Sequence, residues 1–131
     1  MALDKPEDIE ALADGLSDMA DAMHKRLLKA IKSAEIELAE VQTQFQREAL
    51  LRQKANALYA DAAGAVVEGL PLAQSELLKV VQIAEERIQS IEDLRKGMEI
   101  FGDILVLSAS VMAGKPGPIL AAVKEIQGDL G

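Results

Sequence analysis

The stretch LSDMADAMHKRLLKAIKSAEIELAEVQTQFQREALLRQKANALYADAA, residues 16–63, decides the fold class of this chain. It contains 48 residues without Gly or Pro and is bracketed by Gly15 and Gly64. Nearly every residue in it forms or tolerates a helix, and Gly and Pro are the residues that most often interrupt one. A single helix of this length would measure ~72 Å, whereas a compact domain of this size has a radius of gyration of only ~14 Å. Either the molecule is elongated, or the run breaks without the usual helix breakers.

The apolar residues within this run follow a helical period. From Leu16 to Phe45 they recur in eight steps over 29 residues, a mean spacing of 3.6 that is typical of a nearly straight helix. After Phe45 the apolar positions shift to a face that begins at Leu51 and is rotated by about a third of a turn. We therefore expect a change of packing partner, or a bend, near residues 46–50, and favour the change of partner. Gly15 lies within the rhythm, so we expect it to be tolerated inside the helix or to kink it.

Gly and Pro divide the rest of the chain. Gly69 and Pro71 suit the end of one helix and the start of the next, and the Gly-Lys-Pro-Gly run from Gly114 ends another. The predicted elements are a helix over about 6–68, a turn at 69–71, a helix over about 71–113, a turn at 114–117 and a helix over about 118–129. The prediction is a single all-α domain, residues 1–131, with three to four helices in total. Its architecture is an elongated, coiled-coil-like antiparallel helical hairpin with a short C-terminal helix.

The predicted core depends on aliphatic residues. Half of the residues are hydrophobic, but the chain has only two Phe, one Tyr and no Trp. Leu, Ile, Val, Met and Ala suit narrow seams between helices. We expect the hairpin seam to be carried by Leu38, Val41, Phe45, Ile88, Ile91 and Met98. We expect the contact with the C-terminal helix to be carried by Ile104, Leu105, Leu107, Val111, Ile119 and Leu120.

The net charge of −8 argues against nucleic acid as a general partner, because binding to phosphates needs a basic surface. The absence of Cys removes disulfides, thiol nucleophiles and thiolate metal sites. The N-terminal segment is acidic and has no apolar core of a secretory signal. These features favour the cytoplasm, with export by a signal-independent route left open.

His24 is the single histidine and the first candidate for chemistry. Histidine phosphotransfer domains are helical bundles of similar size, but their motif has Lys-Gly three to four residues after the His, where this chain has Leu27 and Leu28. A di-iron bundle needs two Glu-x-x-His motifs, which one His cannot supply. We therefore interpret His24 as a surface residue, and predict no cofactor, no metal and no catalytic residue.

Lys25, Arg26, Lys29 and Lys32 form a basic band in the first helix. They either contact anionic lipid or an acidic partner, or simply form a solvated face with helical ion pairs such as Asp21–Lys25. We favour the solvated face.

The segment 100–123 has only two charged residues, Asp103 and Lys115. One interpretation is an apolar hairpin that inserts into membranes. The other, which we favour, is that the last helix folds back onto the end of the preceding one, which would explain apolar residues on several faces.

The function predicted from sequence is a non-enzymatic interaction or assembly module. It would bind a protein partner or a second copy of itself through apolar helix faces, and we expect a homo-oligomer. The alternative is a membrane-active helical protein that uses residues 100–126.

Overall fold

A computed structural model describes residues 1–131 and contains helices but no strands. The prediction of an all-α fold is confirmed. The helices are α1 (Pro6–Lys32), α2 (Leu38–Ala60), α3 (Gln74–Ser90), α4 (Leu94–Ala113) and α5 (Pro116–Leu130). The prediction of three to four helices is wrong, because both long helices that we expected are divided.

The first division lies at residues 33–37, where α1 ends without Gly or Pro. Ala34 adopts a left-handed conformation with φ of 55°. This lets the Glu35 amide donate to the Ala30 carbonyl at 2.9 Å and the Ala34 amide to the Ile31 carbonyl at 3.2 Å. The two bonds form a Schellman ending, which normally uses Gly at this position. The predicted helix over 6–68 therefore stops at Lys32, while Gly15 and residues 46–50 lie inside intact helices.

The second division lies at residues 91–93, inside the helix predicted over 71–113. Ile91 has extended backbone angles, and the Asp93 carboxylate accepts a hydrogen bond from the Arg95 amide at 3.1 Å. Asp93 is thus the N-cap of α4, a role for which Asp is strongly preferred. The end of α4 at Ala113 matches the prediction, with Gly114 at φ of 73° in the left-handed region.

The connection between α2 and α3 spans residues 61–73 and includes the predicted turn at 69–71. It is fixed by the N-terminal residues. The Ala2 amide donates to the Leu72 carbonyl at 2.6 Å, and the Val67 amide to the Leu3 carbonyl at 2.8 Å. Ala2 and Leu3 are fully buried, so this end of the bundle is closed by backbone pairing and apolar burial together.

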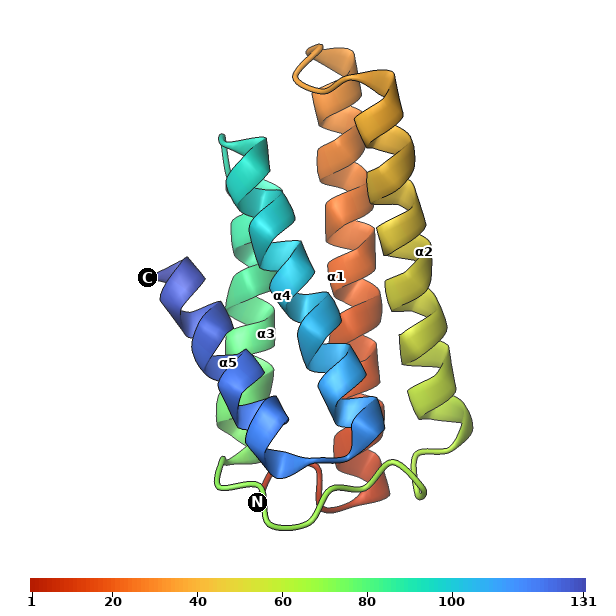
Figure 1. The fold of residues 1–131 in the computed structure, drawn as a ribbon, viewed down its shortest axis with the longest axis vertical. Helices are drawn as coiled ribbons and strands as arrows, with labels where there is room; N and C mark the ends of the chain where they lie inside the picture. Colours follow the sequence, from red (N-terminus) through yellow and green to blue (C-terminus); the bar gives the residue numbers. More distant parts are fainter.

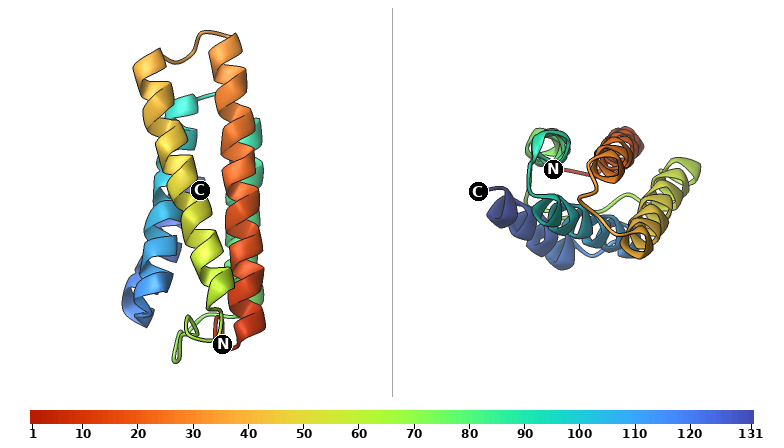
Figure 2. Two further views of the ribbon diagram at one scale, coloured as in Figure 1. Left: turned by 90° about the vertical axis from the view of Figure 1, so that its right-hand side faces the viewer. Right: turned by 90° about the horizontal axis from the view of Figure 1, so that it is seen from above.

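The five helices form two layers (Figures 1 and 2). α1 and α3 make one layer, and α5, α4 and α2 make the other, with α4 in the middle. The predicted hairpin of two long helices is replaced by successive hairpins, in which α1 packs against both α2 and α3, and α4 against α5. The tip of the α1–α2 hairpin projects beyond the loop between α3 and α4 (Figure 1).

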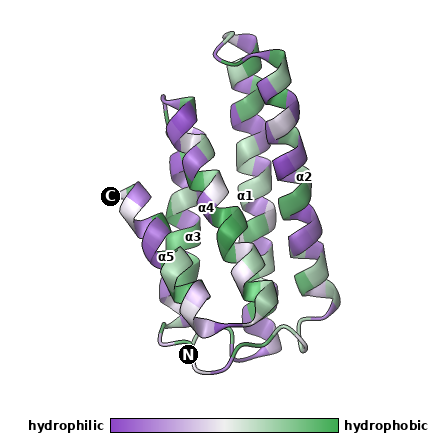
Figure 3. Ribbon diagram, in the orientation of Figure 1, coloured by the Kyte–Doolittle hydropathy of each residue, from purple (hydrophilic) through white to green (hydrophobic).

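The core follows the apolar stripe of α1 until the helix reaches that tip. Leu16, Met19, Met23 and Leu27 are fully buried, whereas Ile31 is exposed. Halfway along α1, a side-chain carbon added at Gly15 would lie 3.1 Å from Val81 Cγ1, so α1 and α3 approach closely there. Hydrophobic residues also line much of α4 (Figure 3), which lies between two neighbours in its layer.

Arg26 joins the two loops that divide the long helices. Its side chain is 1% exposed. Nε donates to the Ile91 carbonyl at 3.0 Å and Nη2 to the Glu92 carbonyl at 3.1 Å. The same guanidinium makes a two-pronged pair with the Glu35 carboxylate at 3.0 and 3.1 Å. Arg26 was predicted to lie in an exposed basic band, and this is wrong: it is an internal tie between the loops.

Replacing Arg26 with Met should destabilise the protein by about 3 kcal/mol, because the change removes a buried charge-assisted network and leaves its acceptors without their donor. Lys29→Met, on the same helix but exposed, is the matched control and should change stability by less than about 0.5 kcal/mol. Urea unfolding followed by circular dichroism measures both. Equal effects of the two changes would contradict the role given to Arg26.

Replacing Ala34 with Gly should stabilise the protein by about 1 kcal/mol, because Gly adopts the left-handed conformation without steric cost. Ala49→Gly, at an exposed site inside α2, should instead destabilise it by about 1 kcal/mol. The opposite signs in thermal unfolding are the expected result. A loss of stability in Ala34→Gly would show that the α1 ending is not left-handed.

Candidate functional site

Most residues predicted to carry an interaction are packed inside the molecule. Leu38 alone is mainly exposed, at 76%. Those buried are Val41, Ile88, Ile104, Leu107, Val111 and Ile119. Those partly buried are Phe45, Ile91, Met98, Leu105 and Leu120.

The expected seam is formed differently from the prediction. α2, which carries Val41 and Phe45, packs against α1 and α4 and makes no contact with α3, which carries Ile88. Leu38 begins α2 at the projecting tip and lies outside any seam. The apolar stripes are therefore divided among several short interfaces within one chain.

The apolar segment considered for membrane insertion is mostly covered within the chain. Ile104, Leu107 and Val111 are fully buried, and α5 folds back onto α4. None of the helices combines the length and the apolar character that crossing a bilayer would require.

His24 takes part in a polar network between α1 and α2. Its Nδ1 lies 3.1 Å from the Glu48 carboxylate. Arg52 forms ion pairs with this Glu48 carboxylate at 3.0 Å and with the Asp21 carboxylate at 2.8 Å. Asp21 thus pairs with Arg52 across the helices, where the sequence suggested Lys25. The ring of Phe45 lies against His24 with centroids 5.4 Å apart. The four charged or polar side chains bond to one another, so this network joins two helices.

Three carboxylates gather where α4 meets α5, a cluster that the sequence analysis missed. Oxygens of Asp103, Glu125 and Asp129 lie within 4.8 Å of one another. Burial, together with a hydrogen bond to Asp129 and the neighbouring negative charges, raises the pKa of Asp103 to about 7. The hydrogen bond with Asp103 and the Lys96 ammonium at 3.6 Å lower the pKa of Asp129. With this pKa, Asp103 is protonated below about pH 7 and can then donate to the Asp129 carboxylate. In the sequence, this cluster was indicated by the i, i+4 spacing of Glu125 and Asp129, which places both acids on one face of a helix.

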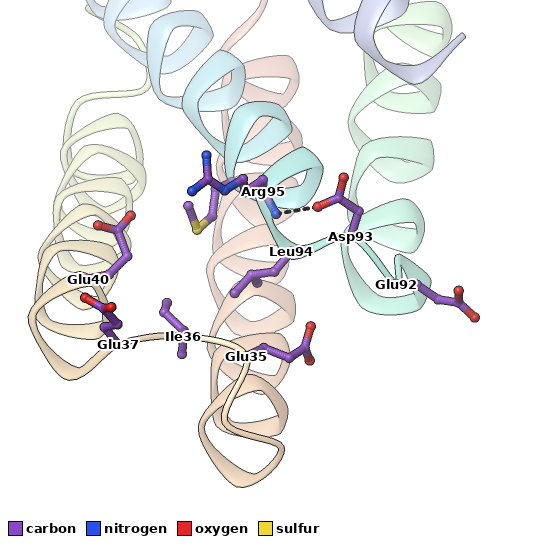
Figure 4. Close-up of a pocket in the computed structure, with 9 residues that line it drawn as sticks. Glu35, Ile36, Glu37, Glu40, Glu92, Asp93, Leu94 and Arg95 are labelled. Carbon is purple, nitrogen blue, oxygen red and sulfur yellow. Dashed lines mark hydrogen bonds between the residues drawn. The ribbon is translucent and has the colours of Figure 1, made fainter.

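A cleft of about 740 Å³ opens at the end of the bundle where α1 meets α2 and α3 meets α4. Figure 4 shows its walls: the α1–α2 loop on one side and the beginning of α4 on the other. Its lining residues are Glu35, Ile36, Glu37, Glu40, Glu92, Asp93, Leu94, Arg95 and Met98. We call it the tip cleft. It combines three apolar side chains with five carboxylates and one guanidinium.

The carboxylates of the tip cleft differ in what already binds them. Glu35 is held by Arg26, whose hydrogen bond lowers the pKa of this carboxyl. Asp93 caps α4, and Glu40 accepts a hydrogen bond from Gln44 Nε2 at 3.2 Å. Glu37 and Glu92 make no ion pair. The tip cleft thus presents free negative charge beside apolar side chains.

The outer side of α1 at the same end is basic. Lys25, Leu28, Lys29, Lys32 and Ser33 line a shallow depression of about 500 Å³. We call it the basic face. Its three lysines are exposed and in no ion pair, and Leu28 is also exposed, with Ile31 next to it on the helix. Without Arg26, this is what remains of the predicted basic band.

Comparisons with known proteins find no relative for this chain: no family model matches it, and neither a curated protein nor a solved structure is significantly similar.

The protonated Asp103 predicts a pH dependence. Between about pH 4 and 7 the folded state holds a proton that the unfolded state releases, so the free energy of unfolding falls as pH rises through this window. In the variant Asp103→Asn this side chain cannot ionise. Its free energy of unfolding should therefore fall less than that of the wild type as pH rises through this window. The measurement is urea unfolding at about pH 5 and about pH 8.

Glu68→Gln, which replaces an exposed acid outside the cluster, is the control and should keep the wild-type difference between the two pH values. An equal difference in Asp103→Asn and wild type would contradict the shared proton.

Proposed function

We propose that this protein is a non-catalytic helical interaction module that binds a basic amphipathic helix of a protein partner in the tip cleft. The observation that carries the proposal is the composition of that cleft. Its apolar side chains are the half-buried Ile36 and Met98 and the buried Leu94, and they lie among five carboxylates and the guanidinium of Arg95. An apolar floor with a negative rim is complementary to a helix that has aliphatic residues on one side and lysines beside them.

The energetics of such binding divide into two parts. Leu94 is already buried, at 7% exposure, so the apolar gain would come from the half-buried Ile36 and Met98, at about 0.8 kcal/mol per CH₂ group newly covered. Glu37 and Glu92 would attract lysines of the partner, mainly raising the association rate and fixing the orientation. Because these carboxylates are exposed, their contribution should weaken as the salt concentration rises.

The internal packing supports a preformed cleft. Arg26 holds Glu35 on one wall and the carbonyls of Ile91 and Glu92 on the other. Binding would then require little ordering of the loops, which lowers its entropic cost. The membrane-active alternative is less favoured, because most of its large apolar residues lie inside the bundle and only Val106 and Met112 are exposed.

The test uses a synthetic helical peptide of about five turns. Its Leu residues are three or four positions apart on one face, and its Lys residues lie beside them. The double variant Glu37→Lys, Glu40→Lys should bind it at least about tenfold more weakly than wild type, because the rim charge is reversed. The control is Glu7→Lys, Glu10→Lys, with the same charge change and the same spacing, also near a helix start, but in α1 at the other end of the bundle. Isothermal titration calorimetry at low and high salt measures all three.

A second peptide with Ser in place of Leu keeps the charge and removes the apolar face. It should bind much more weakly than the Lys/Leu peptide. Equal binding of the two peptides would contradict a role for the apolar floor. An equal loss of affinity in the two double variants would show that only net charge matters.

A further inference from the structure

The basic face has the chemistry that the tip cleft is proposed to bind. Lys25, Leu28, Lys29 and Lys32 follow the i, i+3, i+4, i+7 spacing, so they share one side of α1. We infer that the occupant of the tip cleft is the basic face of a second copy of this chain. This inference rests on the proposed function and names its partner.

Charge complementarity is the first argument. The chain carries a net charge of −8, yet three exposed lysines without ion pairs gather on two turns of one helix. The C-terminal position of Lys29 and Lys32 favours positive charge through the helix dipole. That effect does not account for the exposed Leu28 and Ile31 beside them. An acidic cleft with an apolar floor matches both features.

The position of the two surfaces is the second argument. Glu35 and Glu37 of the tip cleft follow directly after Lys32 and Ser33 of the basic face, so both surfaces lie at the same end of the bundle. A two-fold axis beyond this end would let each copy place its basic face on the other's cleft. Such a reciprocal contact closes as a dimer and leaves neither surface free to extend a filament. It would also bring the exposed Leu38 at the tip close to the partner.

Charge exchange tests the inference. Glu37→Lys with Glu40→Lys makes the cleft basic, and Lys25→Glu with Lys29→Glu makes the face acidic. Each variant alone should dissociate at least about tenfold more readily than wild type in sedimentation equilibrium, because like charges then face each other. Mixing the two should restore a dimer, since both contacts of the mixed pair again join opposite charges. Glu7→Lys with Glu10→Lys should dimerise as wild type does.

The milder variant Lys25→Gln with Lys29→Gln removes the attraction without repulsion, and should weaken the dimer less than charge reversal does. Thermal unfolding of every variant checks that it is folded.

A wild-type protein that stays monomeric at high concentration overturns the inference, and binding of the Lys/Leu peptide to that monomer would leave the proposed function intact. A dimer indifferent to both charge reversals also overturns it, and failure of the peptide to bind would remove the proposed function as well. A third outcome would also overturn the inference. If monomeric wild type floats with anionic phosphatidylserine vesicles and the lysine variants do not, the basic face binds lipid.

Discussion

The hydrogen bonds of the Arg26 guanidinium are the interactions on which the loop end of this bundle, with the tip cleft, depends. A side chain with a single donor could not fix the position of two loops. The planar guanidinium of Arg26 has five donors and bonds several acceptors at once. Here it binds one carboxylate in the α1–α2 loop and two backbone carbonyls in the α3–α4 loop. These carbonyls belong to the residues where the helical hydrogen-bond pattern stops. The buried charge makes four hydrogen bonds, two of them to a carboxylate, and such bonding is the condition under which burying a charge is tolerable.

The tip cleft is a consequence of that tie. The loops are held together at their base by Arg26, while the α1–α2 hairpin continues past the α3–α4 loop (Figure 1), and the tip cleft lies between them (Figure 4). Helix starts also add charge there, because Asp93 caps α4, and Glu37 and Glu40 lie at the first turn of α2. Acidic residues are favoured at helix N-termini for electrostatic reasons. The negative rim of the cleft therefore arises from the same rules that form the helices.

Two features of the candidate site show how far sequence alone could reach. The basic band was visible in the spacing of its lysines, and three of its four members are exposed. Arg26 shares that spacing, but local sequence gives no sign of a carboxylate and two carbonyls from other loops. The helix breaks were missed for a related reason. Ala34 is an excellent helix former, and its left-handed conformation is held by the two Schellman bonds at this exposed position.

The sequence by itself determined that the chain is helical, where the apolar stripe of α1 lies, and that α4 ends before Gly114. These properties depend on propensity and on residues three or four positions apart, which are local. Tertiary structure alone decided that the 48-residue run folds into a hairpin at 33–37, that Arg26 lies inside, and that Glu35, Glu92 and Met98 share one cleft. Those outcomes depend on which elements meet in space, as in the bonds from Arg26 to Ile91 and Glu92, 65 and 66 positions away. No periodicity within a helix records which distant residues will meet.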